Sequence, residues 1–147
     1  MRFIRFERED EAEEWARKKL ELSRAPEFFR CLSAVDRDNN FVCVVVLTNF
    51  SSRGVDMNIA LEGKKMTPKS TVEMFNYIFG FLFEELFIVR ATGLTGWDNT
   101  KAKKIIQHFG FRLEGVMRKA LPEDRDLAVY GFLAEDYRQH NWYRKND

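Results

Sequence analysis

Basic side chains gather around the expected start of a helix, where they would suit an anionic ligand. Thr67 is a typical N-cap and Pro68 a typical first helical residue, so we expect a helix to begin at Pro68. The free N–H groups of a helix start bind phosphate, and three lysines would add positive charge: Lys64, Lys65 and Lys69. The alternative is an ordinary capped helix that follows a lysine-containing loop.

Carboxylates at strand ends are candidates for a general base. Asp56 lies on the face of the expected strand 55–61 that is opposite its apolar residues, and Glu62 follows this strand directly. If Asp56 is covered, its pKa would be raised, which would suit it to accept a proton. The alternative for Asp56 is a solvated residue at the start of a strand. Asp98 and Glu114 are further candidates for the same role.

Other catalytic chemistries lack the residues that they need. The two histidines and two cysteines lie far apart, without the spacing of metal ligands: His108, His140, Cys31 and Cys43. The sequence contains neither a Ser-His-Asp pattern nor a Gly-Lys-Ser/Thr loop. Both cysteines lie in apolar, strand-like runs, so we expect buried free thiols in a reducing cytosol. No metal site is predicted.

One unit of strand, polar turn and short helix would position a site, over residues 89–117. A strand with β-branched residues leads into Gly96-Trp97-Asp98, and a helix then starts at Asn99 or Thr100 and ends at Gly110. The apolar residues of this helix form a single stripe: Ala102, Ile105, Ile106 and Phe109. A glycine suits the left-handed conformation of a helix end, and a second strand follows it at once.

Hydrophobic periodicity and turn residues predict the remaining elements. The expected strands are 2–6, 27–35, 40–48, 55–61, 89–95, 111–120 and 127–133, and the expected helices are 7–22, 68–86, 99–110 and 134–145. Strands that alternate with helices after a hairpin indicate an α/β (α+β) fold, with a mixed central sheet of six to seven strands and helices on both faces. The helix 68–86 carries apolar and aromatic residues around most of its circumference, which indicates broad burial or a subunit contact.

Length and charge limit the class of protein. The 147 residues suit a single domain, 1–147, and 24 basic side chains nearly cancel 23 acidic ones, for a net charge of +1. This balance gives no reason to expect nucleic acid or a membrane as a partner. No apolar run is long enough to span a bilayer, and charges interrupt the stretch where a signal peptide would be apolar, so a cytoplasmic protein is expected.

An ordered set of residues in the second half of the chain carries a family resemblance. The set is Asn99-x-x-Ala102, then Gly110-Phe111 and Glu114-Gly115, with Arg118 and Tyr130-Gly131 downstream. It resembles the second half of the GCN5-related N-acetyltransferase (GNAT) superfamily over residues 55–133. The ribosomal-protein-acetyltransferase-like branch, including small versions encoded by bacteriophages, is the most similar.

The resemblance implies direct transfer of an acetyl group from acetyl-CoA to an amine of a small molecule or protein. In a slit where two neighbouring strands diverge, the pantetheine arm of the coenzyme would lie along three strand residues: Ile59, Ala60 and Leu61. The pyrophosphate would bind around the helix start: Gly63, Lys64, Lys65, Thr67 and Lys69. Asn99 matches the family asparagine that contacts the pantetheine arm. A helix cap is the alternative for Asn99, and the two roles are compatible.

The sequence departs from the family pattern in two places. Only Gly63 remains of the glycine-rich phosphate loop, and Ile106 occupies the position where many members have a tyrosine that protonates the leaving thiolate. A second hypothesis is therefore a catalytically inactive GNAT-like protein that serves as a binding or assembly module. A homodimer would explain the surplus phenylalanines of the helix 68–86.

Overall fold

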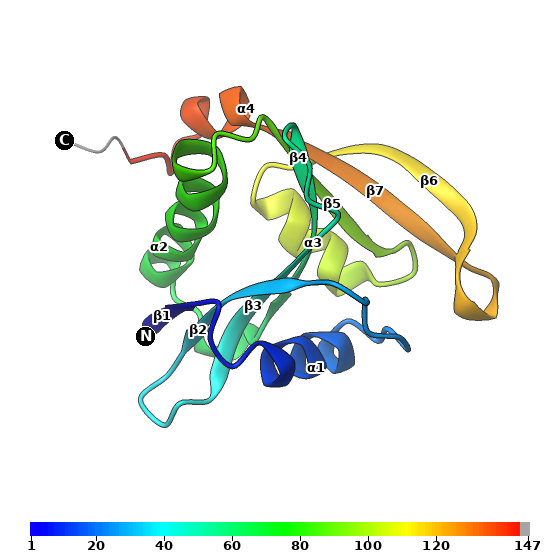
Figure 1. Cartoon of the computed structure of the whole chain (residues 1–147), viewed down its shortest axis with the longest axis horizontal. Helices are drawn as coiled ribbons and strands as arrows, with labels where there is room; N and C mark the ends of the chain where they lie inside the picture. The colour runs from blue at the N-terminus through cyan, green and yellow to red at the C-terminus, as the bar shows by residue number, and fades with distance from the viewer. Residues whose placement is uncertain (145–147) are drawn as a thin grey trace.

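A single mixed sheet organises residues 1–144, which are the residues that this computed structural model describes (Figure 1). The sheet contains seven strands in this part of the chain, in the order β1-β2-β3-β4-β5-β7-β6. Their bounds are β1 Arg2–Arg5, β2 Arg30–Val35, β3 Phe41–Thr48, β4 Gly54–Leu61, β5 Arg90–Gly96, β6 Arg112–Leu121 and β7 Arg125–Leu133. Only the β4–β5 pair is parallel. The predicted mixed sheet of six to seven strands is confirmed.

Helices cover both faces of this sheet, as predicted (Figure 1). One face carries α1 (Glu9–Lys19), and the other carries α2 (Pro68–Phe79), α3 (Thr100–His108) and α4 (Ala134–Gln139). Alternate residues of β3 divide between the two faces, since Val44 belongs to the apolar cluster of α1 and Val45 to the cluster of α2. Short turns complete the chain: the 3₁₀ turns η1 (Gly63–Lys65) and η3 (Pro122–Asp124), and the π-helical turn η2 (Gly80–Glu85).

The predicted helix 68–86 is wrong in its second half, where the chain widens into η2. Leu86 donates its N–H to the carbonyl oxygen of Phe81, five residues earlier, at 3.0 Å. The turn buries three consecutive side chains: Phe81, Leu82 and Phe83. A regular amphipathic helix buries one stripe, so this apolar run favours the wider turn. Most of the surplus phenylalanines lie in the core, although Phe87 is 75% exposed. A homodimer stays a prediction.

Two other predicted helices are too long. The first, predicted as 7–22, is limited to α1 because Arg8 and Glu21 adopt left-handed φ values of 52° and 56° on either side of it. The last, predicted as 134–145, ends at Gln139, and residue 145 lies outside the described residues. The predicted left-handed end of the helix before β6 is confirmed, since Gly110 has a φ of 96°.

The far end of the sheet is an irregular edge. β6 pairs only with β7, and the register of this pairing shifts between Leu113 and Gly115 and again between Met117 and Leu121. Most side chains of β6 are exposed. The β6–β7 hairpin projects beyond the rest of the molecule (Figure 1).

Both cysteines lie in central strands of the sheet, Cys31 in β2 and Cys43 in β3. Cys31 and Cys43 are buried and free, as predicted, and burial raises the pKa of the Cys31 thiol to about 12. Within the described chain, no helix combines the length and the apolar character that crossing a bilayer requires.

Aromatic rings form the centre of the core on the α2 face. Phe79 is fully buried and its ring lies within 6.3 Å, centroid to centroid, of six others: Phe75, Phe83, Phe109, Phe111, Phe132 and Tyr137. These rings come from α2, η2, the end of α3, β7 and α4. They fix α3 against the sheet, and α3 in turn carries Asn99 at its start.

Replacing Phe79 by alanine should lower the free energy of unfolding by about 3–5 kcal/mol, because the change removes a buried ring and leaves a cavity. Urea unfolding followed by tryptophan fluorescence measures this loss. Phe87→Ala, at an exposed position a few residues along, is the matched control and should change stability by no more than about 0.5 kcal/mol. Equal losses in the two variants would contradict the central role of this ring.

Candidate active site

The two parallel strands of the sheet separate halfway along their length. Pairing of β4 with β5 runs from Gly54 opposite Arg90 to Met57 opposite Gly93 and then stops. At the point of separation, the Asn58 side-chain amide donates to the carbonyl oxygen of Leu94 at 2.7 Å. The last residues of β4 therefore have no partner strand on the β5 side, as the predicted slit requires.

The exposed edge of β4 presents backbone donors to this gap. On its other side, Glu62 donates its N–H to the carbonyl oxygen of Val42 at 2.8 Å. In an antiparallel pair, N–H groups point alternately toward and away from the partner strand. The N–H groups of Ile59 and Leu61 therefore point away from β3, into the gap. They are suited to bind an amide of a thin ligand or an oxygen that becomes negative.

The gap is nearly filled by side chains. Its free volume is about 30 Å³, which is space for about one water molecule. The walls come from the end of α1, the end of β4 and the start of α3: Lys19, Leu20, Ile59, Ala60, Leu61, Asn99, Lys101, Ala102 and Ile105. A pantetheine arm fits only if one of these walls moves.

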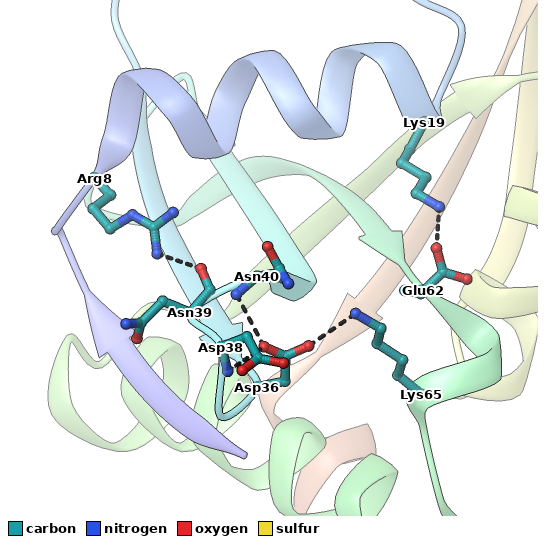
Figure 2. A network of polar contacts seen from close by, with 8 residues as sticks. All are labelled: Arg8, Lys19, Asp36, Asp38, Asn39, Asn40, Glu62 and Lys65. Carbon is teal, nitrogen blue, oxygen red and sulfur yellow. Dashed lines mark hydrogen bonds and ion pairs between the residues drawn. The ribbon is translucent and has the colours of Figure 1, made fainter.

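The end of α1 is the wall that is tied down by polar contacts. Lys19 forms an ion pair with Glu62, at the end of β4, with 2.5 Å between Nζ and Oε2 (Figure 2). Arg125 donates to the backbone oxygen of Glu21 at 3.0 Å and holds both carboxylate oxygens of Asp98. The turn 19–21 is thus fixed to both sides of the gap, and opening the gap means breaking these contacts.

Most of the carboxylates predicted as bases are held by basic partners. Hydrogen bonds from these partners lower the pKa of three of them: Lys19 acts on Glu62, Arg125 on Asp98 and Arg90 on Glu114. A carboxylate with a lowered pKa is a weaker proton acceptor. Glu62 therefore fits its predicted catalytic role less well than Asp56 does.

Asp56 is half-buried and faces the side of the sheet that carries α1. Its strand neighbour is Thr48, and its Oδ2 accepts a hydrogen bond of 2.8 Å from the amide of Asn49. Asn58, which marks the point of separation, lies two residues along the same strand face. Asp56 therefore lies two residues before the point of separation, in the paired part of β4, and its carboxylate forms no ion pair among the described residues. The hydrogen bond to Glu114 and, less strongly, the charge of Asp56 raise the pKa of Arg90.

The helix start of the predicted anion site forms as expected, but fewer of its donors are free than expected, and anion binding stays a prediction. Thr67 caps α2 as predicted: its hydroxyl accepts from the Ser70 N–H, and the Ser70 hydroxyl accepts from the Thr67 N–H. Pro68 has no N–H, so among the residues that the structure describes only the Lys69 N–H is left without a partner at this helix start. Lys65 is also occupied, by the Asp36 carboxylate.

The ion pair of Lys65 with Asp36 lies close to the pair of Lys19 and Glu62 (Figure 2). The distance between Lys65 Nζ and Asp36 Oδ2 is 2.8 Å. The hydrogen bond from Lys65 lowers the pKa of Asp36. Lys64 and Lys69 are exposed and form no ion pair within residues 1–144. A side chain added at Gly63 would meet nothing within 4 Å, so this glycine leaves open space beside the two lysines.

Asn99 has the cap role that was one of its two predicted roles. Its Oδ1 accepts a hydrogen bond of 3.1 Å from the Ala102 N–H, which caps α3. Its Nδ2 has no partner among the described residues, and Asn99 is one of the residues that line the gap. Ile106, at the position of the family tyrosine, is buried in the core.

A wider groove reaches the same point from the α1 side of the sheet. The part of this groove next to the gap, called the inner cavity below, has a volume of about 570 Å³ and shares Leu20 with the gap. Asn58 and Glu13 both line it, and Glu13 is only 5% exposed. The two carboxylate oxygens of Glu13 share the single N–H of Arg17 Nε. Two ligands could thus approach one point from opposite sides of the sheet.

Sequence patterns missed the residues that close the gap and line the groove. The sequence placed Lys19, Leu20 and Glu13 only within the expected helix 7–22 and assigned none of them to a site. A carboxylate on the buried stripe of that helix is the signal that identifies Glu13. Within residues 1–144, no group of three or more histidine, cysteine or acidic side chains could hold a metal ion.

Solved structures with the same architecture are acetyltransferases. No family model matches the chain, and neither does any curated protein. A chimera of the spermidine N-acetyltransferase SpeG from Vibrio cholerae matches with a TM-score of 0.70 and 16% identity, over 95% of this chain and 100% of that one. SpeG from Vibrio cholerae in complex with manganese ions gives 0.68 and 16%, over 95% and 96%. A GNAT-family acetyltransferase from Bacillus anthracis gives 0.59 and 20%, over 71% and 66%.

These matches confirm the predicted fold class, and the chain has the GNAT fold. The identities are low, so the agreement is one of fold. The divergence of β4 from β5 and the cap at Asn99 are observed directly in the structure of this chain.

Two substitutions of Asn99 separate its cap role from a ligand role. Asn99→Ala removes both the acceptor and the free amide, and should lower stability by about 1 kcal/mol. Asn99→Asp keeps an acceptor for the Ala102 N–H and should retain most of that stability. We expect both variants to bind coenzyme A more weakly in calorimetric titrations. Undiminished binding by Asn99→Asp would show that the side chain is a cap only.

Proposed function

We propose that this protein is an acetyl-CoA-dependent N-acetyltransferase that transfers an acetyl group to an amine. The separation of β4 from β5 after Met57 and Gly93 is the observation that carries the proposal. It leaves the N–H groups of Ile59 and Leu61 without partners on the β5 side. In a regular sheet the two strands would stay paired along their length, because each unpaired backbone group costs free energy.

The residues around the gap fit a coenzyme A thioester in most respects. Ile59, Ala60 and Leu61 would run beside the pantetheine arm, and the free amide of Asn99 would donate to it. Lys64 and Lys69, which have no ion pair in the described part of the chain, would contact the phosphates together with the Lys69 N–H. When bound, acetyl-CoA would supply an activated acetyl group.

The chemistry would take place where the gap and the groove meet. The N–H groups of Ile59 and Leu61 are placed to stabilise an oxygen that becomes negative during acyl transfer. We assign proton acceptance from the amine to Asp56, through a water, because its strand neighbour Thr48 and its face neighbour Asn58 line the groove and its carboxylate forms no ion pair among the described residues. Ile106 has no proton to give, so the leaving thiolate would be protonated by a different group.

The acceptor would be an amine of a small molecule or of a protein. SpeG, which shares the fold, is a spermidine N-acetyltransferase, and this favours a small polyamine. The sequence resemblance to the ribosomal-protein-acetyltransferase-like branch, with its bacteriophage members, favours a protein amine instead. A cytoplasmic location would supply acetyl-CoA in either case.

Two observations favour a second function, a GNAT-like binding or assembly protein without catalytic activity. The gap holds only about 30 Å³, and the start of α2 satisfies most of its own donors. In a protein that never binds the coenzyme, the gap could stay filled and the start of α2 could keep its own hydrogen bonds. Coenzyme binding therefore decides between the two functions.

Acetyl-CoA should stabilise the protein, and a variant with a loosened α1 should bind it more tightly. At one hundred times its dissociation constant, the ligand should add about 2.7 kcal/mol to the free energy of unfolding. Glu62→Gln removes the ion pair with Lys19 and one negative charge near the phosphates, so we expect a lower dissociation constant in calorimetry. Glu14→Gln, which breaks the exposed pair with Lys18 on the same helix, should leave that constant unchanged.

An absence of binding by both the native chain and Glu62→Gln would support the assembly protein. Equal tightening in the Glu62 and Glu14 variants would mean that overall charge, rather than the contact at the gap, controls binding.

Asp56→Asn should lower kcat/KM for acetyl transfer by about 10²–10⁴-fold, which is the usual contribution of a general base. The dissociation constant for acetyl-CoA should stay the same, because Asp56 lies on the acceptor side. A coupled assay of released thiol, with each amine tested over a range of pH, measures the effect. A loss below tenfold with an unchanged pH profile would remove Asp56 from this role.

A further inference from the structure

The groove on the α1 face continues outward into a second, larger cavity. This outer cavity has a volume of about 910 Å³ and shares Glu27 and Thr48 with the inner one. The inner cavity ends at Asn58, where the strands separate, and the outer cavity lies beside Phe28 and Phe50. A long molecule with one end at the proposed reaction point would therefore place its other end in the outer cavity.

The outer cavity carries excess negative charge. Three acidic side chains and one basic side chain line it, a net charge of −2: Glu9, Asp10 and Glu27 against Arg30. Glu9 already accepts hydrogen bonds from Arg30 Nε and from a backbone N–H, each at 2.9 Å. Asp10 and Glu27 have no basic partner within residues 1–144. Their carboxylates remain available to a ligand.

Two phenylalanine rings beside this cavity are uncovered. Phe28 is 85% exposed and Phe50 is 48% exposed, on the loops before β2 and after β3. Phe6, in the same half of the molecule, lies under the guanidinium of Arg30 at 3.9 Å, whereas no cation of the described chain covers these two rings. Aromatic faces attract cations, so the rings and the carboxylates favour the same kind of ligand group.

The register of the sheet gives the distance between the two ends of the groove. Val46 of β3 is paired with Asn58, and Thr48 follows two residues later along the strand. At about 3.3 Å per residue, Thr48 is roughly 7 Å from the level of Asn58. Phe50 lies farther out, beyond the end of β3 and after the left-handed Asn49. A cation in the outer cavity would lie at a similar distance from the reacting nitrogen.

We propose that the outer cavity binds a second cationic group of the acceptor. This inference rests on the proposed function for the identity of the reacting amine, and it adds the substrate class. The preferred acceptors are extended amines with a second positive charge about 7 Å or more from the nitrogen that is acetylated. Asp10 and Glu27 pair with that charge, and the rings of Phe28 and Phe50 pack against the carbons beside it.

Two amines of equal length, one with and one without the second charge, test the cavity directly. The probes are 1,7-diaminoheptane and 7-amino-1-heptanol, titrated calorimetrically into the whole protein without coenzyme. We expect the diamine to bind about tenfold more tightly, with an advantage that shrinks as salt is added. The double variant Asp10→Asn/Glu27→Gln should reduce the ratio of the two constants to about one.

A matched control variant separates the effect of overall charge from the effect of the outer cavity on diamine binding. Asp38→Asn/Glu135→Gln removes the same two charges from exposed positions that do not line the groove, and should leave the tenfold ratio intact. Thermal unfolding of both double variants checks that each is folded. Equal binding of the two amines by the native chain, or a diamine preference that survives Asp10→Asn/Glu27→Gln, would overturn the proposal.

Acetylation of the same amines separates this inference from the proposed function. If the diamine preference depends on Asp10 and Glu27 but no acetyl transfer occurs with either amine, the cavity assignment stands and the enzymatic proposal fails. If both amines are acetylated with equal kcat/KM in the native chain and in the variant, the enzyme is confirmed and the cavity assignment fails.

Discussion

The incomplete pairing of β4 with β5 is the constraint on which the rest of the structure depends. Parallel strands of eight and seven residues are joined over only four residue pairs, and Asn58 closes the ladder with its side chain. The separation is possible because β4 is held on its other side by β3, while β5 is held by β7. Each strand thus keeps one full ladder, and the cost of the unpaired edge is confined to a few backbone groups. Those groups are the ones that an acyl-transfer site needs.

Side chains satisfy this weak point from both faces of the sheet. The last turn of α1 packs over the gap and is tied to it through Lys19 and Arg125, while α3 closes the opposite wall. In the resulting site, most acidic and basic side chains near the gap are already paired with one another. Ligand binding in such a site exchanges existing contacts for new ones, so affinity reflects a difference between two sets of polar contacts.

The sequence predicted the architecture well because the signals that set it are local. A glycine with positive φ at 110, a Thr-Pro helix start and period-two strands are read from a few neighbouring residues, and the structure contains all of them. A helix cap was one of the two roles predicted for Asn99, and the structure contains it. The closure of the gap was not predictable, because Lys19 and Glu62 are 43 residues apart and meet only after α1 has packed on the sheet. The same is true of Glu13, whose burial depends on the partner face of β3. The π-helical turn was missed because the consecutive apolar residues Phe81, Leu82 and Phe83 were interpreted as broad burial of a regular helix.

The irregular ladder between β6 and β7 has a consequence for solubility. A long edge strand with exposed Leu113 and Met117 would ordinarily be a template for adding strands from other molecules. Two breaks in register disturb the row of outward-facing amides and carbonyls, and the charges of Arg118 and Lys119 disfavour a like neighbour. The distortion of the projecting hairpin therefore makes its edge a poor template for a strand from another molecule.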